Sequence, residues 1–166
     1  MKTTQKYQAI GTMSGSSCDG LDIICCEFTL QKNIWSYVLI KAHYIPYEEK
    51  LKTQLKEAHK SSIKDLHRLN ASYGVWLGNT ILRFIKDNNL EPLVITSHGH
   101  TVLHEPDKGY SLQIGSGAHI SEICNIPVVT DIRNNDIACN GQGAPLVPIG
   151  DHFLFSEYDI CLNLGG

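Results

Sequence analysis

Apolar residues occur in short blocks separated by polar, glycine-containing stretches along the whole chain. Three blocks near the N-terminus, residues 7–13, 21–30 and 35–44, are rich in β-branched and aromatic side chains and predict strands. The connection between the second and third blocks is short, which favours an antiparallel meander. Helical periodicity follows over residues 48–59 and 62–88, with Ser61 or Ser62 as the N-cap of the longer helix and Asp65 in its first turn.

The second half of the chain alternates between short strands and helices. Strands are predicted over residues 93–96, 110–115 and 126–131, the last a buried strand ending at Asp131, with a Ser-His-Gly loop after the first of them. A helix is predicted over residues 117–124, a Gly- and Pro-bearing loop leads into an apolar segment over 141–155, and a last strand covers 158–166. A meander followed by βαβ units predicts an α/β fold with a mixed sheet flanked by helices.

Polar clusters come directly after three of these strands, over residues 14–19, 97–100 and 131–136. Ligands of open α/β sheets bind where such loops meet at the strand ends. The sequence therefore predicts a binding site formed by these three clusters.

Composition and charge argue against several classes of function. The chain has 166 residues, 42% of them hydrophobic and 19% charged, with a net charge of −3, which suits one globular domain. Its basic residues are dispersed, so no nucleic-acid footprint is expected. No apolar run approaches the roughly 20 residues of a membrane span, and no secretory signal is expected. The six cysteines form no CxxC pair and are interpreted as buried thiols of a cytoplasmic protein.

The loop "GTMSGSSCDG" is rich in small residues that can expose backbone N–H groups to an anion. Three of its residues favour tight turns, Gly11, Gly15 and Gly20, and three add hydroxyl groups, Ser14, Ser16 and Ser17. Asp19 or Asp22 could hold Mg²⁺ through water. The alternative is a wide β-hairpin turn without a ligand. Neither GxxxxGK[ST] nor GxGxxG occurs, so a nucleotide site here would be of another type.

Other polar residues allow several kinds of chemistry. His98, His100 and His104 could ligate a metal, but the HExxH spacing is absent, and a ligand-contacting loop is preferred. Asp131 is placed to be a partly desolvated general base beside Arg133, and the alternative is an Asp–Arg pair that caps the next helix. A serine hydrolase would use Asp19 or Asp22, His98, and Ser111 or Ser116, but no GxSxG elbow occurs.

Five segments together, in order along the entire chain, resemble the anhydro-N-acetylmuramic acid kinases: "MSGSSCDGLD", "SHGHTVLHEP", "SLQIGSGAHISE", "IPVVTDIRNNDIACNGQGAPLVP" and "LNLGG". The resemblance implies a ribonuclease-H-like, actin-like ATPase fold with two domains around a cleft. Residues 1–157 would form the N-terminal domain and residues 158–166 the first strand of a second one. The implied reaction is hydrolysis of the anhydro bridge of 1,6-anhydro-N-acetylmuramic acid with transfer of the ATP γ-phosphoryl group to O6.

The resemblance also implies roles for individual residues. Asp131 would activate the water, the 11–20 loop would bind the ATP phosphates, and Asp19 would help to place Mg²⁺. Residues that line the sugar pocket would be His98, Gly99, Gln113, Ile114 and Gly115, with Arg133 beside the base. The sequence departs from the family pattern at Ser16 and Cys18, where threonine and leucine are usual, and at His100, where glutamine is usual.

The chain ends where the family begins its second phosphate loop and second domain. Little or no turnover is therefore expected from these residues alone, because catalysis requires both walls of the cleft. The alternative function is a non-catalytic sugar- or partner-binding module. Such a module allows a homodimer through an apolar face that the second domain normally covers.

Overall fold

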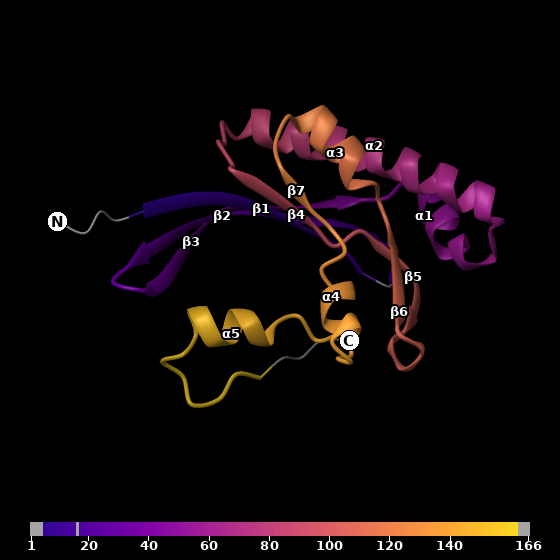
Figure 1. The fold of residues 1–166 in the computed structure, drawn as a ribbon. Coiled ribbons are helices and arrows are strands. Elements are labelled where there is room, and N and C mark those ends of the chain that lie inside the picture. The colour runs from indigo at the N-terminus through magenta and orange to yellow at the C-terminus, as the bar shows by residue number, and fades with distance from the viewer. Residues whose placement is uncertain (1–4, 16, 163–166) are drawn as a thin grey trace.

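A five-stranded mixed sheet forms the centre of the computed structural model, which describes residues 5–15 and 17–162 (Figure 1). Strands β1 (Gln5–Ser14), β2 (Gly20–Gln31) and β3 (Ile34–Pro46) form the predicted antiparallel meander. Strand β4 (Val94–Ser97) pairs in parallel with β1, and β7 (Val128–Val129) pairs in parallel with β4. The strand order β3-β2-β1-β4-β7 confirms the prediction of a mixed sheet.

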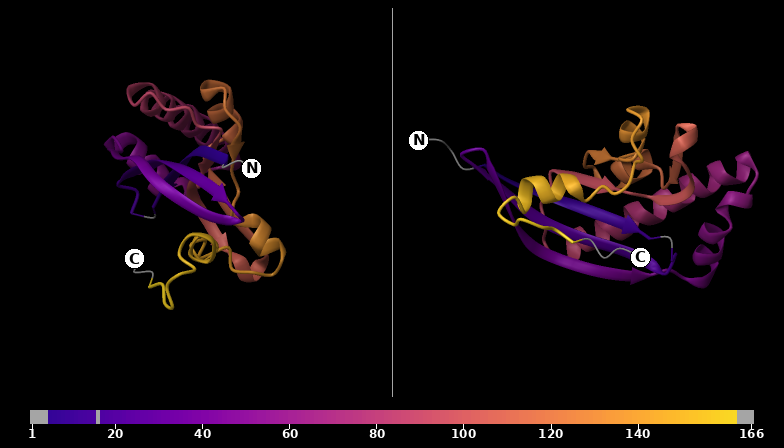
Figure 2. Two further views of the ribbon diagram at one scale, coloured as in Figure 1. Left: turned by 90° about the vertical axis from the view of Figure 1, so that its left-hand side faces the viewer. Right: turned by 90° about the horizontal axis from the view of Figure 1, so that it is seen from below.

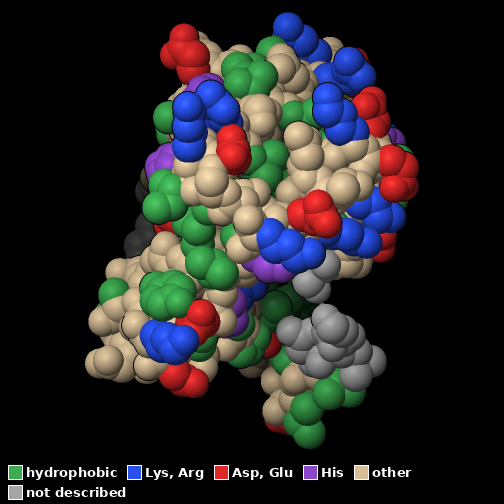
Figure 3. All heavy atoms as spheres, turned by 90° about the vertical axis from the view of Figure 1, so that its right-hand side faces the viewer, with side chains coloured by type: hydrophobic (Ala, Val, Ile, Leu, Met, Phe, Trp, Pro, Cys, Tyr) green, Lys and Arg blue, Asp and Glu red, His purple; other side chains and the backbone are tan. Residues whose placement is uncertain are grey.

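Helices lie on both sides of this sheet (Figures 1 and 2). One face is covered by α2 (Ile63–Asp87) and α3 (Gly117–Cys124), and α4 (Asn134–Ala138) and α5 (Pro148–Leu154) lie on the opposite side. Helix α1 (Glu49–Lys56) and the 3₁₀ turn Ala58–Lys60 connect the meander to α2. Figure 3 shows side chains of both charges interspersed over the end of the molecule around α1 and α2, with no large patch of one sign.

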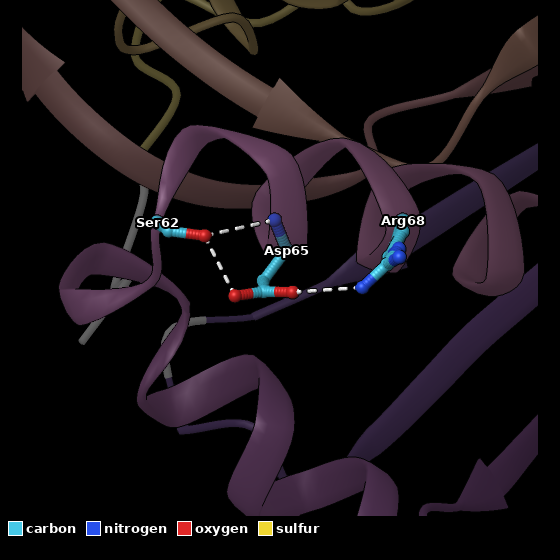
Figure 4. Close-up of polar contacts among 3 residues, drawn as sticks. All are labelled: Ser62, Asp65 and Arg68. Carbon is cyan, nitrogen blue, oxygen red and sulfur yellow. Dashed lines mark hydrogen bonds and ion pairs between the residues drawn. The ribbon is translucent and has the colours of Figure 1, made fainter.

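Helix α2 supplies much of the core because its apolar residues recur at helical spacing. Tyr73, Leu77 and Ile81, each four residues apart, are at most 1% exposed and pack with Ile10 and Ile95 of the sheet. The N-cap is Ser62, one of the two predicted candidates, and its Oγ accepts a hydrogen bond from the Asp65 N–H at 3.2 Å (Figure 4). Local sequence signals therefore predicted this helix correctly.

Three predictions about elements are wrong or incomplete. Directly after the predicted Ser-His-Gly loop, where no strand was predicted, the chain forms β5 (His100–Glu105), which pairs with β6 (Tyr110–Ile114) in a separate hairpin through the short turn Pro106–Lys108. The central Thr-Val-Leu residues of β5 favour a strand, but the histidines on either side of them interrupt the apolar pattern. Strand β7 ends at Val129 rather than at residue 131, and residues 158–162 form no strand because no neighbouring strand pairs with them. Residues 163–166 lie outside the described residues.

Two further expectations concern the burial of the cysteines and the absence of a membrane-spanning segment. Cys18, Cys25, Cys26 and Cys124 are buried as predicted, but Cys139 and Cys161 are exposed, because they lie in the irregular C-terminal part of the chain. Among the helices of residues 5–15 and 17–162, none has the length and apolar character that crossing a bilayer demands.

Candidate functional site

The predicted polar clusters meet at one edge of the sheet. Strands β1, β4 and β7 run in the same direction, so their carboxyl ends lie side by side. Thr12 near the end of β1 donates from Oγ1 to Ser97 Oγ at 3.2 Å, and the His98 N–H donates to the Thr12 carbonyl at 3.1 Å. These two bonds hold the first loop directly against the Ser-His-Gly turn.

A polar cavity of about 240 Å³ lies at this edge. It is lined by the five predicted wall residues of the sugar pocket, together with the predicted base: His98, Gly99, Gln113, Ile114, Gly115 and Asp131. It is also lined by Asn70, Ser97, Ser116, Gly117 and Thr130. A larger groove of about 480 Å³ between α5 and the sheet has predominantly apolar walls and lacks comparable chemistry, so the polar cavity is the better candidate site.

Arg133 does not line the cavity but is bonded to its wall. Its Nε donates to His98 Nε2 at 2.8 Å, and its Nη1 donates to the Gly143 carbonyl at 2.9 Å. A guanidinium can only donate, so His98 Nε2 must accept and the imidazole proton resides on Nδ1, which lies 3.0 Å from the Gly99 carbonyl. Burial, together with the Arg133 charge, lowers the pKa of His98 and keeps it neutral.

Glycine is required at two positions of the wall because the backbone is left-handed and crowded there. Gly99 has φ +68°, and a Cβ on it would lie 2.5 Å from the Ile114 carbonyl oxygen. Gly115 has φ +119°, and a Cβ would lie 2.8 Å from Leu77 Cδ1. The wall therefore approaches the core more closely than any side chain would permit.

Asp131 lies exposed at the rim of the cavity, with the unusual φ of +56°. Its Oδ1 accepts from Asn134 Nδ2 at 3.2 Å, and its carbonyl accepts the Asn134 N–H. The expectation of a partly desolvated carboxylate beside a cation is wrong, because β7 ends early and Arg133 turns toward His98 instead. The carboxylate is left open to a water or a ligand.

Some residues of the predicted phosphate loop are held within the sheet or the core, and others are accessible at the tip of the loop. Gly11 pairs with Ile24 within the sheet, and Gly20 is needed because a Cβ would lie 2.5 Å from the Ile45 carbonyl oxygen. Ser14 is 3% exposed, and its Oγ is a buried atom without a hydrogen-bond partner among the described residues. Gly15, Ser17 and Asp19 remain at the tip, and Ser16 lies outside the described residues.

Asp19, which was predicted to hold Mg²⁺ through water, is paired with a lysine. Lys52 Nζ lies 3.2 Å from Asp19 Oδ1, and this bond lowers the pKa of the carboxyl. Within residues 5–15 and 17–162, no group of three His, Cys, Asp or Glu side chains is arranged to hold a metal. A magnesium ion at Asp19 would have to compete with the Lys52 ammonium group.

The residues of the other metal and hydrolase hypotheses are not brought together. His100 lies 3.9 Å from Cys18 Sγ, and His104 lies 3.1 Å from Ser111 Oγ. Ser116 Oγ contacts His119 at 2.8 Å rather than His98. The three components of the supposed serine triad therefore have separate partners.

Comparison with known proteins shows the family to which the chain belongs. The family model described as anhydro-N-acetylmuramic acid kinase matches residues 7–166. The chain belongs to the anhydro-N-acetylmuramic acid kinase family. Relatives of that name are 35% identical in Nitrosomonas europaea, 40% in Pseudomonas savastanoi pv. phaseolicola and 32% in Sulfurimonas denitrificans, each over 95% of the chain. The matched regions cover 44–45% of those relatives, so the chain spans less than half of their length.

Sequence reasoning missed several cavity residues of this family member, of which Asn70 is the most informative. It is a half-buried amide that follows the buried Leu69 on α2. A polar side chain beside the apolar stripe of a helix is a signal that could have drawn attention to it.

Proposed function

We propose that the chain provides the sugar-binding side of an ATP-dependent kinase. This kinase opens 1,6-anhydro-N-acetylmuramic acid and forms N-acetylmuramic acid 6-phosphate. Membership of the kinase family supports the reaction class. The observation that carries the proposal is the polar cavity with Asp131 at its rim, held against the glycine-containing loop by the Thr12–Ser97 bond. Use of ATP implies the cytoplasm as the compartment.

In this proposal Asp131 takes a proton from a water that attacks C1 of the sugar. The O–C1 bond forms, the C1–O6 bond breaks, and the O6 electron pair attacks the γ-phosphorus of ATP while ADP leaves. No separate acid is needed, because the leaving oxygen passes directly to phosphorus. His98 serves as a neutral, fixed wall, since both of its ring nitrogens are engaged.

ATP is proposed to approach through the loop tip at Gly15 and Ser17, because among the described residues a Cβ on Gly15 would meet only Ser17 Oγ, at 3.7 Å. Magnesium neutralises phosphate charge when it is bound, but no step is assigned to it because Asp19 is paired with Lys52. We also propose that residues 1–157 form the N-terminal domain, and that residues 1–166 alone bind the sugar with little or no turnover.

The test combines sugar binding by calorimetry with phosphate transfer from ATP, using the complete gene product and, separately, residues 1–166. Asp131→Asn is expected to retain binding and to lose transfer by at least about a thousandfold. Asp107→Asn, in an exposed turn of the β5–β6 hairpin, is the matched control and should retain transfer. Absence of sugar binding, or full transfer by Asp131→Asn, would overturn the proposal. Measurable transfer by residues 1–166 alone would overturn only its last part.

A further inference from the structure

Asn70 reaches the sugar cavity from the long helix rather than from a strand end. Among the described residues that line the cavity, it is the one that α2 contributes. The helix is packed tightly against the cavity wall there, since a Cβ on Gly74 would lie 2.8 Å from the backbone nitrogen of Ser116. The position of Asn70 relative to the wall is therefore fixed.

The orientation of the Asn70 amide follows from its partner. The Gly115 N–H donates to Asn70 Oδ1 at 2.7 Å, and the Ser116 N–H donates to the Asn70 carbonyl at 3.1 Å. A backbone N–H can only donate, so the amide oxygen must face Gly115 and Nδ2 must point away from it. Within the described part of the chain, Nδ2 has no hydrogen-bond partner and is not a buried, unsatisfied atom.

The other side-chain nitrogen atoms of the wall are already engaged. His98 uses both ring nitrogens, and Gln113 Nε2 donates to Ser111 Oγ at 2.6 Å and to Thr101 Oγ1 at 3.3 Å. Ser111 Oγ donates its one proton to the Leu103 carbonyl at 3.2 Å, so it accepts from Gln113 and the amide nitrogen must face it. Gln113 Oε1 is then buried without a partner among the described residues. The cavity wall thus contains one unused amide donor, on Asn70, and one unused amide acceptor, on Gln113.

We propose that Asn70 is a specificity-determining residue that donates from Nδ2 to the carbonyl oxygen of a secondary amide on the bound sugar. The N–H of the same amide would satisfy Gln113 Oε1. The unused donor and acceptor lie on two different side chains, so they match a group whose acceptor and donor are separate atoms. The acetamido substituent offers a carbonyl oxygen and an N–H, whereas a hydroxyl has a single oxygen for both roles. The inference rests on the proposed function for the identity of the sugar. A site built around hydrogen bonds rejects analogues that leave its polar groups unpaired.

The experiment compares two ligands on two variants by calorimetry. The ligands are 1,6-anhydro-N-acetylmuramic acid and the same sugar with a hydroxyl in place of the acetamido group. Asn70→Asp keeps an acceptor for the Gly115 N–H but replaces the Nδ2 donor by an oxygen. We expect it to weaken binding of the acetamido sugar about tenfold or more and to leave the hydroxyl analogue unchanged or tighter. Asn79→Asp, on an exposed position of the same helix, should change neither affinity.

A second measurement uses the unaltered chain, so the proposal stays testable if Asn70→Asp folds poorly. In ¹⁵N NMR spectra, the side-chain NH₂ signals of Asn70 should shift on addition of the acetamido sugar and much less with the hydroxyl analogue. Equal losses for both ligands, unchanged binding of the acetamido sugar by Asn70→Asp, or an unmoved Asn70 signal would overturn the proposal while leaving the proposed function intact. Failure of the unaltered chain to bind the acetamido sugar would overturn both.

Discussion

Arg133 Nε lies 2.8 Å from His98 Nε2, and this bond joins the loop after β7 to the turn after β4. The same guanidinium reaches the Gly143 carbonyl, so one side chain holds both ends of the 133–143 segment. It also fixes the tautomer of a buried histidine in the cavity wall. The arginine therefore acts on the site through His98 rather than by touching a ligand in the cavity.

Arg133→Lys should weaken sugar binding about tenfold, because an ammonium group cannot bond His98 and Gly143 in the geometry of the guanidinium. His98→Gln should have a similar effect, and the double variant should be little worse than either, since both changes break the same link. Calorimetry on the three variants measures this, with Arg83→Lys on the exposed face of α2 as control. Strictly additive losses would show that the two residues act independently.

Stability should fall as the solution becomes acidic, because burial lowers the pKa of His98 and of His100 below the ordinary 6.5. Between that value and the lower folded pKa, the unfolded chain binds protons that the folded chain does not. The free energy of unfolding is therefore highest above about pH 6.5 and decreases as pH falls, by up to about 1.4 kcal/mol per pH unit for each proton.

Urea unfolding at about pH 7.5 and about pH 5.5 checks this dependence. His98→Gln and His100→Gln should each reduce the loss of stability between the two conditions. His67→Gln, at an exposed position of α2, serves as the control. An identical pH dependence in all four proteins would contradict the prediction.

Local patterns predicted the parts of the fold that depend on local physics. Helical periodicity over residues 62–88 predicted α2, and Ser62 is one of the two serines predicted as its N-cap. The extent of β7 was not predictable in the same way, because an apolar run does not reveal how many residues find a strand partner. The β5 strand was missed because its hairpin stands apart from the main sheet.

The cavity at the ends of β4 and β7 could be predicted in outline, because parallel strand ends converge whichever side chains they bear. Its contacts were less predictable. Arg133 is two residues from Asp131, yet it turns to His98, and Asn70 enters from a helix far away in sequence. Both results depend on tertiary packing, about which a single sequence carries no direct signal.

Ser62→Ala should lower the free energy of unfolding by about 1 kcal/mol, because it removes the N-cap of α2. Ser62 Oγ accepts the Asp65 N–H and also donates to Asp65 Oδ2 at 2.6 Å (Figure 4). Arg68→Ala breaks only an exposed ion pair with Asp65, at 3.3 Å, and should cost less than about 0.5 kcal/mol. Chemical unfolding of both variants measures the difference, and equal costs would argue against the capping role.

Gly74→Ala tests how rigidly α2 supports the cavity wall. Alanine is favoured over glycine in a helix by about 1 kcal/mol, but here its Cβ would lie 2.8 Å from both the nitrogen and the carbonyl oxygen of Ser116. Since these are backbone atoms of the wall, relief requires the helix or the wall to move. We expect a net loss of about 1–3 kcal/mol in the free energy of unfolding, together with weaker sugar binding.

Gly150→Ala in α5 is the matched control, because its Cβ would meet no atom of residues 5–15 and 17–162 within 4 Å. It should be neutral or stabilising by up to about 1 kcal/mol and should leave sugar binding unchanged. Both variants are measured by denaturant unfolding and by calorimetry. The gain in helix propensity is common to the two substitutions, so the difference between their free energies of unfolding reports the close contact at Gly74. If Gly74→Ala stabilised the chain as Gly150→Ala does, the wall would have to yield freely, and the fixed position of Asn70 beside Gly115 would lose its support.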